Sequence, residues 1–242
     1  MSQRSLEGKV ALITGGGRGI GKETALLFAQ EGAAVAVSAT TKSQIEEVAA
    51  EVRGLGVPGL ALQADVGYGD QVERMVARTV AELGPIDILV NNAGSFNVGE
   101  VKDFDEDVWD SSMRVNLKSF FLCSRAALNT GKMLERETGQ IINVASIMMR
   151  REAPQLAVHA SFKHGVLGFS ESLRREVSRQ GIKVTVVAPS VVDTAMVQDP
   201  SVAHVLHRRE RWVTAGDCAE LILFIANRPP HVDIGDVSIL GV

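Results

Sequence analysis

Short runs of β-branched and other apolar residues alternate with longer amphipathic stretches along the whole chain. Within the short runs the apolar residues are mostly consecutive, which is typical of parallel strands covered on both faces. The pattern predicts seven strands: Val10–Thr14, Ala34–Ala39, Leu60–Ala64, Ile86–Asn91, Gln140–Ala145, Ile182–Ala188 and Asp236–Leu240. It predicts six helices: Gly19–Gln30, Ser43–Leu55, Asp70–Leu83, Glu106–Leu134, Ala157–Arg179 and Asp217–Ala226.

Alternation of strands and helices predicts right-handed crossovers and an α/β fold, a doubly wound parallel sheet with helices on both faces. Glycines fall where helices should end, as capping glycines do: Gly32, Gly56, Gly84, Gly139 and Gly181. No linker, low-complexity tract or repeat divides the chain, so we expect a single domain over residues 1–242. Its irregular segment 196–213, with three arginines and two histidines, is interpreted either as a flap over the substrate site or as a solvated helical loop.

Composition narrows the class of protein. The 242 residues include 25 basic and 29 acidic side chains, for a net charge of −4, and no block of like charge favours nucleic acid. The N-terminal segment lacks the apolar core of a signal peptide, and no apolar run approaches the ~20 residues that a membrane span requires. The two isolated cysteines, Cys123 and Cys218, are typical of buried thiols in a reducing cytoplasm. We therefore expect a cytoplasmic, enzyme-like domain with no nucleic-acid or membrane partner.

A glycine-rich turn lies between the first predicted strand and the first predicted helix. It reads Thr14-Gly15-Gly16-Gly17-Arg18-Gly19-Ile20-Gly21. Glycines let a backbone turn tightly and approach a pyrophosphate, whose charge the helix N-terminus stabilises. A glycine cluster alone also occurs in turns that bind nothing. Here the preceding strand, the following helix and the parallel-sheet pattern favour a dinucleotide site.

The spacing Gly15-x-x-x-Gly19-x-Gly21, with Thr14 in front, resembles the cofactor motif of the short-chain dehydrogenase/reductase family, and of its 3-oxoacyl-acyl-carrier-protein reductases in particular. Further matches follow in order along the chain. Asp65-Val66 is similar to the pair that meets adenine, and Asn91-Asn92-Ala93-Gly94 is similar to the motif that closes the fourth strand. Pro189 and the segment Val192–Thr194 are similar to the residues that touch the nicotinamide and its phosphates, and Gly235 to Gly241 is similar to the final strand. The resemblance implies a Rossmann-type fold. It also implies cofactor contacts at Gly15, Gly17, Arg18, Gly19, Ile20, Gly21, Thr40, Asp65, Val66, Asn92, Ala93, Gly94, Lys163, Pro189, Val192 and Thr194.

The end of the second strand discriminates between NAD and NADP. An NAD site usually has an acidic residue there, which binds the ribose hydroxyls. This chain has no carboxylate from Ser38 to Lys42. Arg18 stands where similar family members direct an arginine at the 2′-phosphate, and a guanidinium fork suits phosphate, with Thr40 or Thr41 assisting. The sequence favours NADP over NAD, and an Arg18 that points into solvent is the alternative.

The resemblance also implies the reaction, the interconversion of a small carbonyl compound and an alcohol with the nicotinamide cofactor. In this family a tyrosine exchanges the proton at the substrate oxygen, and its pKa must be lowered because an unperturbed phenol titrates near ~10. A lysine holds the ribose and lowers that pKa, a serine hydrogen-bonds the carbonyl, and an asparagine anchors a water that relays protons to the lysine. Asn116, Ser146 and Lys163 match the asparagine, serine and lysine. Taken singly, each is also an ordinary structural residue, and it is their joint order that indicates a site.

This chain has a different residue at the position of the family's catalytic tyrosine. Thirteen residues after Ser146, the usual spacing, the chain has His159, while Lys163 follows four residues later on the same helix face. The only tyrosine, Tyr68, lies in the predicted adenine-side loop. Phe162 stands where the family usually has a small residue. The glycine usual after the Pro189 position is also replaced, by Ser190.

Three interpretations of His159 stay open. As a substitute acid and base it has a suitable intrinsic pKa near ~6.5, which Lys163 would lower. Its distal nitrogen falls roughly 2 Å short of a phenol oxygen, so transfer needs a shifted substrate or a bridging water. Alternatively, His159 inactivates the site and leaves cofactor binding intact, or it is a helix residue without chemistry in a repurposed pocket. The hypotheses are thus an NADP-dependent oxidoreductase with impaired or altered proton transfer, and a non-catalytic NADP(H)-binding pseudoenzyme acting as a sensor or structural protein.

The remaining expectations concern the residues around Ser146, metal binding and the oligomeric state. Met148-Met149-Arg150-Arg151 follows Ser146, so the methionines form an adaptable apolar wall and the arginines either attract an acidic substrate or face water. No His/Cys/Asp/Glu spacing indicates a metal, and His204 and His207 lack a third ligand. By resemblance, we expect a homo-tetramer or homo-dimer built through the helices Glu106–Leu134 and Ala157–Arg179.

Overall fold

The computed structural model describes residues 4–198 and 212–242. It confirms the seven-stranded parallel sheet, whose strand order is β3-β2-β1-β4-β5-β6-β9. The strands are β1 (Val10–Thr14), β2 (Ala34–Ala39), β3 (Gly59–Gln63), β4 (Ile88–Asn91), β5 (Gly139–Val144), β6 (Ile182–Pro189) and β9 (Asp236–Ile239). Each end lies within two residues of the expected position.

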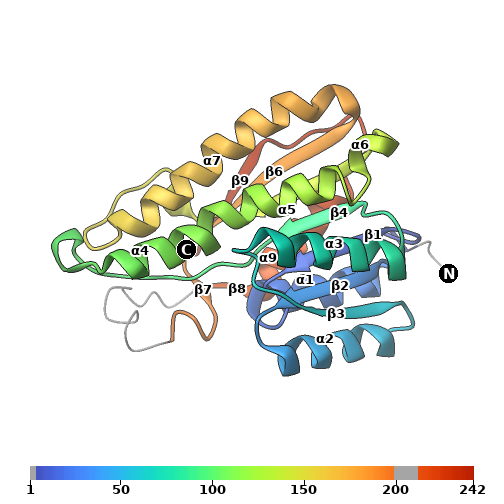
Figure 1. Ribbon diagram of the computed structural model, residues 1–242, viewed down its shortest axis with the longest axis horizontal. Coiled ribbons are helices and arrows are strands. Elements are labelled where there is room, and N and C mark those ends of the chain that lie inside the picture. Colours follow the sequence, from blue (N-terminus) through green and yellow to red (C-terminus); the bar gives the residue numbers. More distant parts are fainter. Residues whose placement is uncertain (1–3, 199–211) are drawn as a thin grey trace.

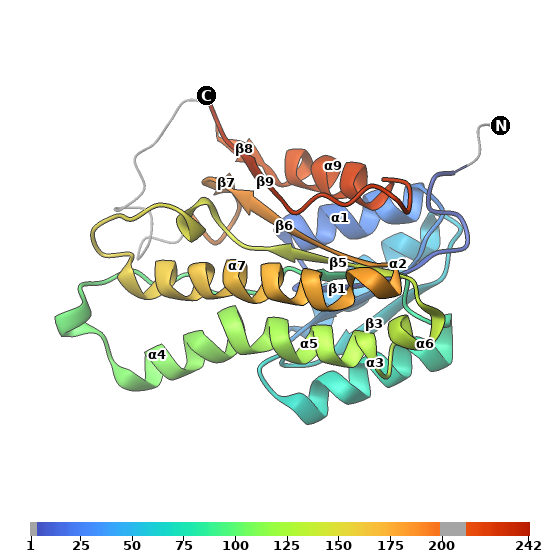
Figure 2. The same ribbon diagram turned by 90° about the horizontal axis from the view of Figure 1, so that it is seen from above.

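Helices cover both faces of the sheet (Figures 1 and 2). One face carries α1 (Gly19–Gln30), α2 (Lys42–Gly54) and α9 (Ala215–Ala226), and the other carries α3 (Gly69–Leu83), α5 (Ser119–Leu128) and α7 (Ala157–Val177). The smaller elements are α4 (Glu106–Met113), α6 (Met133–Arg136), a separate strand pair β7 (Val192–Asp193) and β8 (Val213–Thr214), and 3₁₀ turns at Val101–Asp103, Ile147–Met149 and Ser178–Gln180. Within the described residues no helix is long and apolar enough to cross a membrane.

The continuous apolar runs form strands that are buried on both faces. In β1, Ala11 and Ile13 pack on the α1 face, while Leu12 between them packs on the α3 face. Successive side chains of a strand point to opposite faces, so a run without polar residues supplies both layers of the core. Cys123 and Cys218 are both buried free thiols, as expected.

The expected helix Glu106–Leu134 is wrong as a single element. It divides into α4, one π-helical turn over Arg114–Lys118, and α5, which ends at Leu128. Inside the π turn, the Asn116 side-chain amide donates to the Ser112 carbonyl at 3.1 Å. A side chain that occupies a helical carbonyl competes with the backbone ladder, and π turns mark such sites.

The chain after α5 also differs from expectation. Its turns are made by Lys132 and Glu137 in the left-handed region, and Gly139 is the first residue of β5 instead of a helix cap. Glycines with positive φ angles do follow α1, α2, α3 and α7, at Gly32, Gly56, Gly84 and Gly181.

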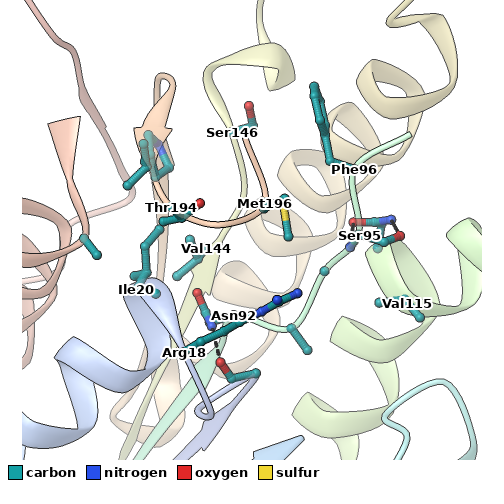
Figure 3. A pocket seen from close by; sticks show the side chains of 18 of the residues that line it. Arg18, Ile20, Asn92, Ser95, Phe96, Val115, Val144, Ser146, Thr194 and Met196 are labelled. Carbon is teal, nitrogen blue, oxygen red and sulfur yellow. Dashed lines mark hydrogen bonds between the residues drawn. The ribbon is translucent and has the colours of Figure 1, made fainter. Parts of the chain in front are cut away.

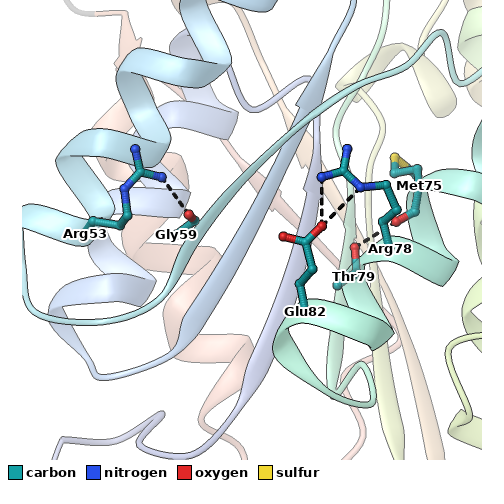
Figure 4. Close-up of polar contacts among 6 residues, drawn as sticks. All are labelled: Arg53, Gly59, Met75, Arg78, Thr79 and Glu82. Atoms are coloured by element: carbon teal, nitrogen blue, oxygen red, sulfur yellow. Dashed lines mark hydrogen bonds and ion pairs between the residues drawn. The ribbon is translucent and has the colours of Figure 1, made fainter.

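Exposed polar contacts lie near the outer edge of the sheet (Figure 4). Arg53 of α2 donates to the Gly59 carbonyl at the start of the edge strand β3, at 2.7 Å. On α3, which covers the other face of the sheet, Arg78 pairs with Glu82 one turn later at 2.7 Å. Exposed pairs of this kind contribute about 0.3–0.5 kcal/mol each, so the buried apolar layers hold this edge in place.

The order of the strands places the site. The chain builds β1, β2 and β3 outward in one direction and then crosses to β4 on the other side of β1. At such a reversal the loops after the two neighbouring strands separate and leave a crevice at their carboxyl ends, where ligands bind in open α/β sheets.

Candidate functional site

A cavity of about 750 Å³ opens at this crevice. Nearly all of the expected site residues line it, from the glycine loop after β1 to Ser146 after β5 and Lys163 on α7. Figure 3 shows Arg18 and Asn92 on one side of this space and Ser146 and Phe96 on the other. Gly21 is the exception, because it lies behind the loop against the Gly15 carbonyl and the Asn92 side chain.

The glycine loop fits a dinucleotide phosphate group. Gly15 and Gly19 have φ values of +63° and +55°, a region that favours glycine. A Cβ on Gly15 would stand 2.9 Å from the Ala93 backbone, so a side chain would displace one loop from the other. The N-terminus of α1 has no side-chain cap and no acidic residue in its first turn. Its free N–H groups, at the cavity wall, therefore suit an anion.

Thr14 joins the loops after β1 and β4. Its buried hydroxyl accepts hydrogen bonds from the backbone N–H of Asn92 at 3.0 Å and of Ala93 at 3.1 Å. The Asn92 side chain donates back to the carbonyls of Thr14 and Gly15. We call this mutual bonding of Thr14 and Asn92 the clasp. No sequence pattern indicates it, because the two residues lie 78 positions apart.

The end of the cavity beside Arg18 is polar and reaches the surface. Arg18 is exposed at its rim, and Thr40, Thr41 and Gln44 stand nearby on the lining. The buried Ser38 hydroxyl also belongs to the lining and has no hydrogen-bond partner among the described residues. An unpaired buried hydroxyl is costly unless a ligand satisfies it, so this end fits a nucleoside with polar groups.

Asp65, after β3, is held in place by its own turn. Its carboxylate accepts from the Gly67 N–H at 2.9 Å, and its backbone N–H donates to the Gln71 side chain. Both Asp65 and Val66 line the cavity, as expected for an adenine contact.

Ser146 is oriented by the backbone. Its hydroxyl oxygen accepts from the Met148 N–H at 3.2 Å, at the start of the 3₁₀ turn that follows β5. The hydroxyl proton therefore stays available for an acceptor in the cavity, which is the role expected of a serine that binds a carbonyl oxygen.

Asn116 has its side chain fully occupied by the protein. Its amide oxygen accepts from the Ser95 N–H at 3.2 Å, and its amide nitrogen donates to the Ser95 hydroxyl and the Ser112 carbonyl. This pairing anchors the segment after Gly94 to the π turn, beside Lys163.

His159 and Lys163 stand on α7, both buried and both on the cavity wall. Burial, followed by the nearby Lys163 ammonium, lowers the pKa of His159 from 6.5 to about 3. Burial lowers the pKa of Lys163 from 10.5 to about 8. The direction expected for His159 is confirmed, yet the imidazole no longer titrates near neutrality, so at pH 7 it is uncharged.

Several cavity residues carried no sequence signal. Phe96, after β4, packs edge-on against His159 with ring centroids 4.6 Å apart. Leu156 and Val191 add apolar surface to the cavity. Nothing in local periodicity distinguishes such residues from core, because only the tertiary fold brings them together.

The apolar wall after Ser146 differs from the expectation. Met148 lines the cavity, but Met149 is fully buried in the core. Arg150 pairs with Asp236 at 3.1 Å and Arg151 is exposed, so neither lines the cavity. The interpretation in which these arginines face away from the substrate therefore agrees with the structure.

Phe162 likewise lies outside the cavity. It is buried against Trp109 of α4, with ring centroids 4.8 Å apart. Of the expected flap 196–213, Met196 and Val197 line the cavity, and residues 199–211, with His204 and His207, lie outside the described part of the chain.

Comparison with known proteins gives consistent matches. The family model for short chain dehydrogenase matches residues 9–203. Subunit BbsD of (2S)-[(R)-hydroxy(phenyl)methyl]succinyl-CoA dehydrogenase from Thauera aromatica is 40% identical over 191 residues, 79% of this chain and 76% of that protein. The 3-oxoacyl-[acyl-carrier-protein] reductase FabG of Staphylococcus epidermidis is 39% identical over 189 residues, 78% of this chain and 77% of that protein.

Solved structures extend the likeness to nearly the whole chain. A variant of actinorhodin polyketide ketoreductase, crystallised with NADPH, has a TM-score of 0.89 at 31% identity and covers 96% of both chains. A short chain dehydrogenase from Burkholderia cenocepacia in complex with NADP has a TM-score of 0.86 at 30% identity and covers 97% of both chains.

Proposed function

Since the chain belongs to the short-chain dehydrogenase family of oxidoreductases, we propose that it is an NADP-dependent enzyme that interconverts a carbonyl compound and an alcohol. The observation that carries this proposal is one continuous cavity with the glycine loop at one end and Ser146 and Lys163 at the other. A dinucleotide with its phosphates at the glycine loop would extend along this space toward Ser146. It would supply the two electrons of the reduction as a hydride.

The preference for NADP rests on the charge at the end of the cavity beside Arg18, where the adenosine would lie. Arg18 and the hydroxyls of Thr40 and Thr41 stand there, and the chain has no carboxylate from Ser38 to Lys42. A guanidinium and hydroxyls suit a 2′-phosphate, whereas a carboxylate would repel it. The related structures that contain NADPH or NADP support the same preference.

The residues at the Ser146 end of the cavity have different roles in the proposed reaction. Ser146 donates to the substrate oxygen, Lys163 holds the ribose, and Asn116 keeps the segment after Gly94 in place. His159 occupies the position at which this family usually has its tyrosine, so proton transfer differs from that of its relatives or is impaired. The aliphatic and aromatic side chains around Ser146 suit the apolar part of a small carbonyl compound.

A second candidate function is a non-catalytic NADP(H)-binding protein. One observation favours it: His159 is buried and uncharged, with a pKa of about 3, so it cannot replace a phenol as the acid near neutral pH. Both candidates use the same cofactor site and differ in turnover.

Titration of the purified protein with NADPH and NADH, followed by a panel of carbonyl compounds, tests both candidates. We expect NADPH to bind at least tenfold more tightly than NADH and to be oxidised by some member of the panel. Tight binding with no turnover on any compound would favour the non-catalytic protein. Failure to bind either cofactor would contradict both.

We also propose that the chain assembles as a homo-tetramer or homo-dimer in the cytoplasm. Apolar side chains are exposed in a row along α4 and α5: Val108, Trp109, Met113 and Phe121. A second hollow of about 340 Å³ lies between the start of α7 and the segment from Val101 to Trp109. Apolar surface gathered on one helical face is typical of a surface that packs against another chain.

A further inference from the structure

Six ionisable side chains among the described residues line the cavity, and only two of them stand on the wall formed by α7. Those two are His159 and Lys163. Arg18 and Glu23 come from the start of α1, Asp65 from the turn after β3, and Asp193 from β7. A reduction at Ser146 needs a nearby acid to protonate the forming alcohol. His159 and Lys163 are therefore the two candidates for that acid.

His159 is unsuited to release a proton. It is only 8% exposed, packs edge-on against Phe96, and faces the Lys163 ammonium along the same helix. Both burial and the nearby cation disfavour the imidazolium form. A neutral imidazole still has one N–H donor and one nitrogen acceptor, so it can hold a water molecule without changing charge.

Lys163 is also buried, but its pKa stays close to neutral pH. Its side chain is 5% exposed, and no hydrogen bond or ion pair joins it to residues 4–198 or 212–242. Its ammonium lies 5.7 Å from the Phe120 ring centroid and 3.9 Å from the position a Cβ would take on Gly94. Burial alone, with no neighbouring carboxylate, lowers the Lys163 pKa, to about 8. A buried ammonium without a partner is directed to the cavity and can lose its proton there.

We propose that the Lys163 ammonium is the acid of this site, and that its proton reaches the substrate oxygen through one water molecule held by the neutral imidazole of His159. The inference rests on the oxidoreductase function proposed above. Such a water has three polar partners, namely the Lys163 ammonium, a His159 ring nitrogen and the substrate oxygen, which is the usual number for an ordered buried water.

The proton balance is as follows. During reduction the water donates one of its protons to the substrate oxygen and receives one from Lys163, so a C–O–H group forms and the lysine becomes a neutral amine. Solvent then returns a proton to the amine. Reduction thus requires the ammonium, which is present below the Lys163 pKa and is lost as the pH rises through it. Oxidation of the alcohol requires the amine and shows the opposite trend.

A titration of the protein without cofactor tests the protonation states directly. With ¹³C-labelled lysine and histidine, NMR should show one lysine with a midpoint near 8 that disappears in Lys163→Arg. It should show that His159, assigned with His159→Gln, stays neutral from pH 5 to 9. A His159 midpoint between 6 and 7 would overturn the proposal.

Kinetics with NADPH test the proton path. The kcat/KM for reduction should fall tenfold per pH unit above about 8 in the wild-type protein and in His159→Gln, whatever the absolute rate of that variant. Lys163→Arg keeps a cation that does not titrate below pH 12. Its reduction rate should drop at every pH, because a guanidinium does not release its proton, and the remaining rate should not fall above pH 8. Its NADPH affinity, measured separately, shows whether the cofactor still binds. Rates in mixtures of H₂O and D₂O should curve with deuterium content, because two protons move in the step.

The outcomes separate this inference from the function on which it rests. Turnover whose pH dependence vanishes in His159→Gln and persists in Lys163→Arg would make His159 the acid and overturn this inference alone. NADPH binding without turnover at any pH would overturn both the enzyme function and this inference.

Discussion

At the scale of single residues, the site combines side chains fixed by the protein with side chains directed to a ligand. Asn116 and Thr14 have their polar groups occupied by backbone or by Ser95. The Ser146 proton and the Lys163 ammonium face the cavity without a described acceptor. The first pair shapes the site, and the second pair is available for chemistry.

Restoring the phenol should restore fast proton transfer. His159→Tyr places an acid beside Lys163, whose positive charge lowers the phenol pKa, and general acid catalysis is worth about 10²–10⁴-fold. We expect kcat for carbonyl reduction to rise at least 100-fold in steady-state assays. Adding Phe162→Ser should give no further gain, because Phe162 packs on Trp109 outside the cavity. An unchanged rate in His159→Tyr, with intact NADPH binding, would indicate a repurposed pocket.

Arg18 should control the choice of cofactor. Its removal in Arg18→Ala deletes a charge-assisted contact to the 2′-phosphate, worth about 1.5–3 kcal/mol. Calorimetry should show NADPH affinity falling about 10- to 100-fold, with NADH affinity unchanged within a factor of three. Thr40→Asp is the opposing variant and should favour NADH. An equal loss of affinity for NADPH and NADH in Arg18→Ala would show that the guanidinium does not bind the 2′-phosphate.

At the scale of elements, two loops from different strands act as one wall. The clasp made by Thr14 and Asn92 binds the turn after β1 to the turn after β4, and the uncapped N-terminus of α1 stands beside it. The wall depends on a hydroxyl that accepts two N–H groups at once.

Thr14→Val should therefore destabilise the protein and weaken cofactor binding together. The valine has nearly the same shape but leaves the Asn92 and Ala93 N–H groups without an acceptor, at a cost of about 1–3 kcal/mol. Thr24→Val is the matched control, because the equally buried Thr24 hydroxyl bonds only the Ile20 carbonyl of its own helix. Urea unfolding should show the larger loss in Thr14→Val. Equal losses would mean that the clasp contributes no more than an ordinary buried hydroxyl.

The sequence predicted regular elements well and their interruptions poorly. Continuous apolar runs located the inner strands, because burial on both faces leaves a distinct composition, and the partly buried edge strands β3 and β9 were located from shorter apolar patterns. The break between α4 and α5 was missed, because it depends on Asn116 meeting Ser95, which lies 21 residues away. Phe96 and Leu156 were missed as cavity residues for the same reason. Motif residues such as Gly15, Asp65 and Asn92 were predictable because they stand in the turns that follow strands, where the order of the fold determines their place.

At the scale of the whole molecule, the helices α4 and α5 leave apolar side chains exposed at Val108, Trp109, Met113 and Phe121. Trp109→Glu combined with Phe121→Glu would place charges there, and light scattering should show a smaller species. Leu134→Glu on α6 is the control, because Leu134 is exposed to a similar extent, 37% against 38% for Trp109, outside this row. A wild-type monomer, or an unchanged mass in the double variant, would contradict assembly through these side chains.

Thr14 and Asn92 lie 78 residues apart, so only folding brings them together, and cofactor binding is therefore coupled to the folding equilibrium. The nucleotide wall exists only when β1 and β4 are paired, so an unfolded or half-folded chain offers it no binding surface. A ligand that binds only the native state stabilises it by about 2.7 kcal/mol at a hundred times its dissociation constant. NADPH should accordingly raise the melting temperature of the wild-type protein and slow its digestion by proteases. The abundance of the protein in a cell would then follow the supply of its own cofactor.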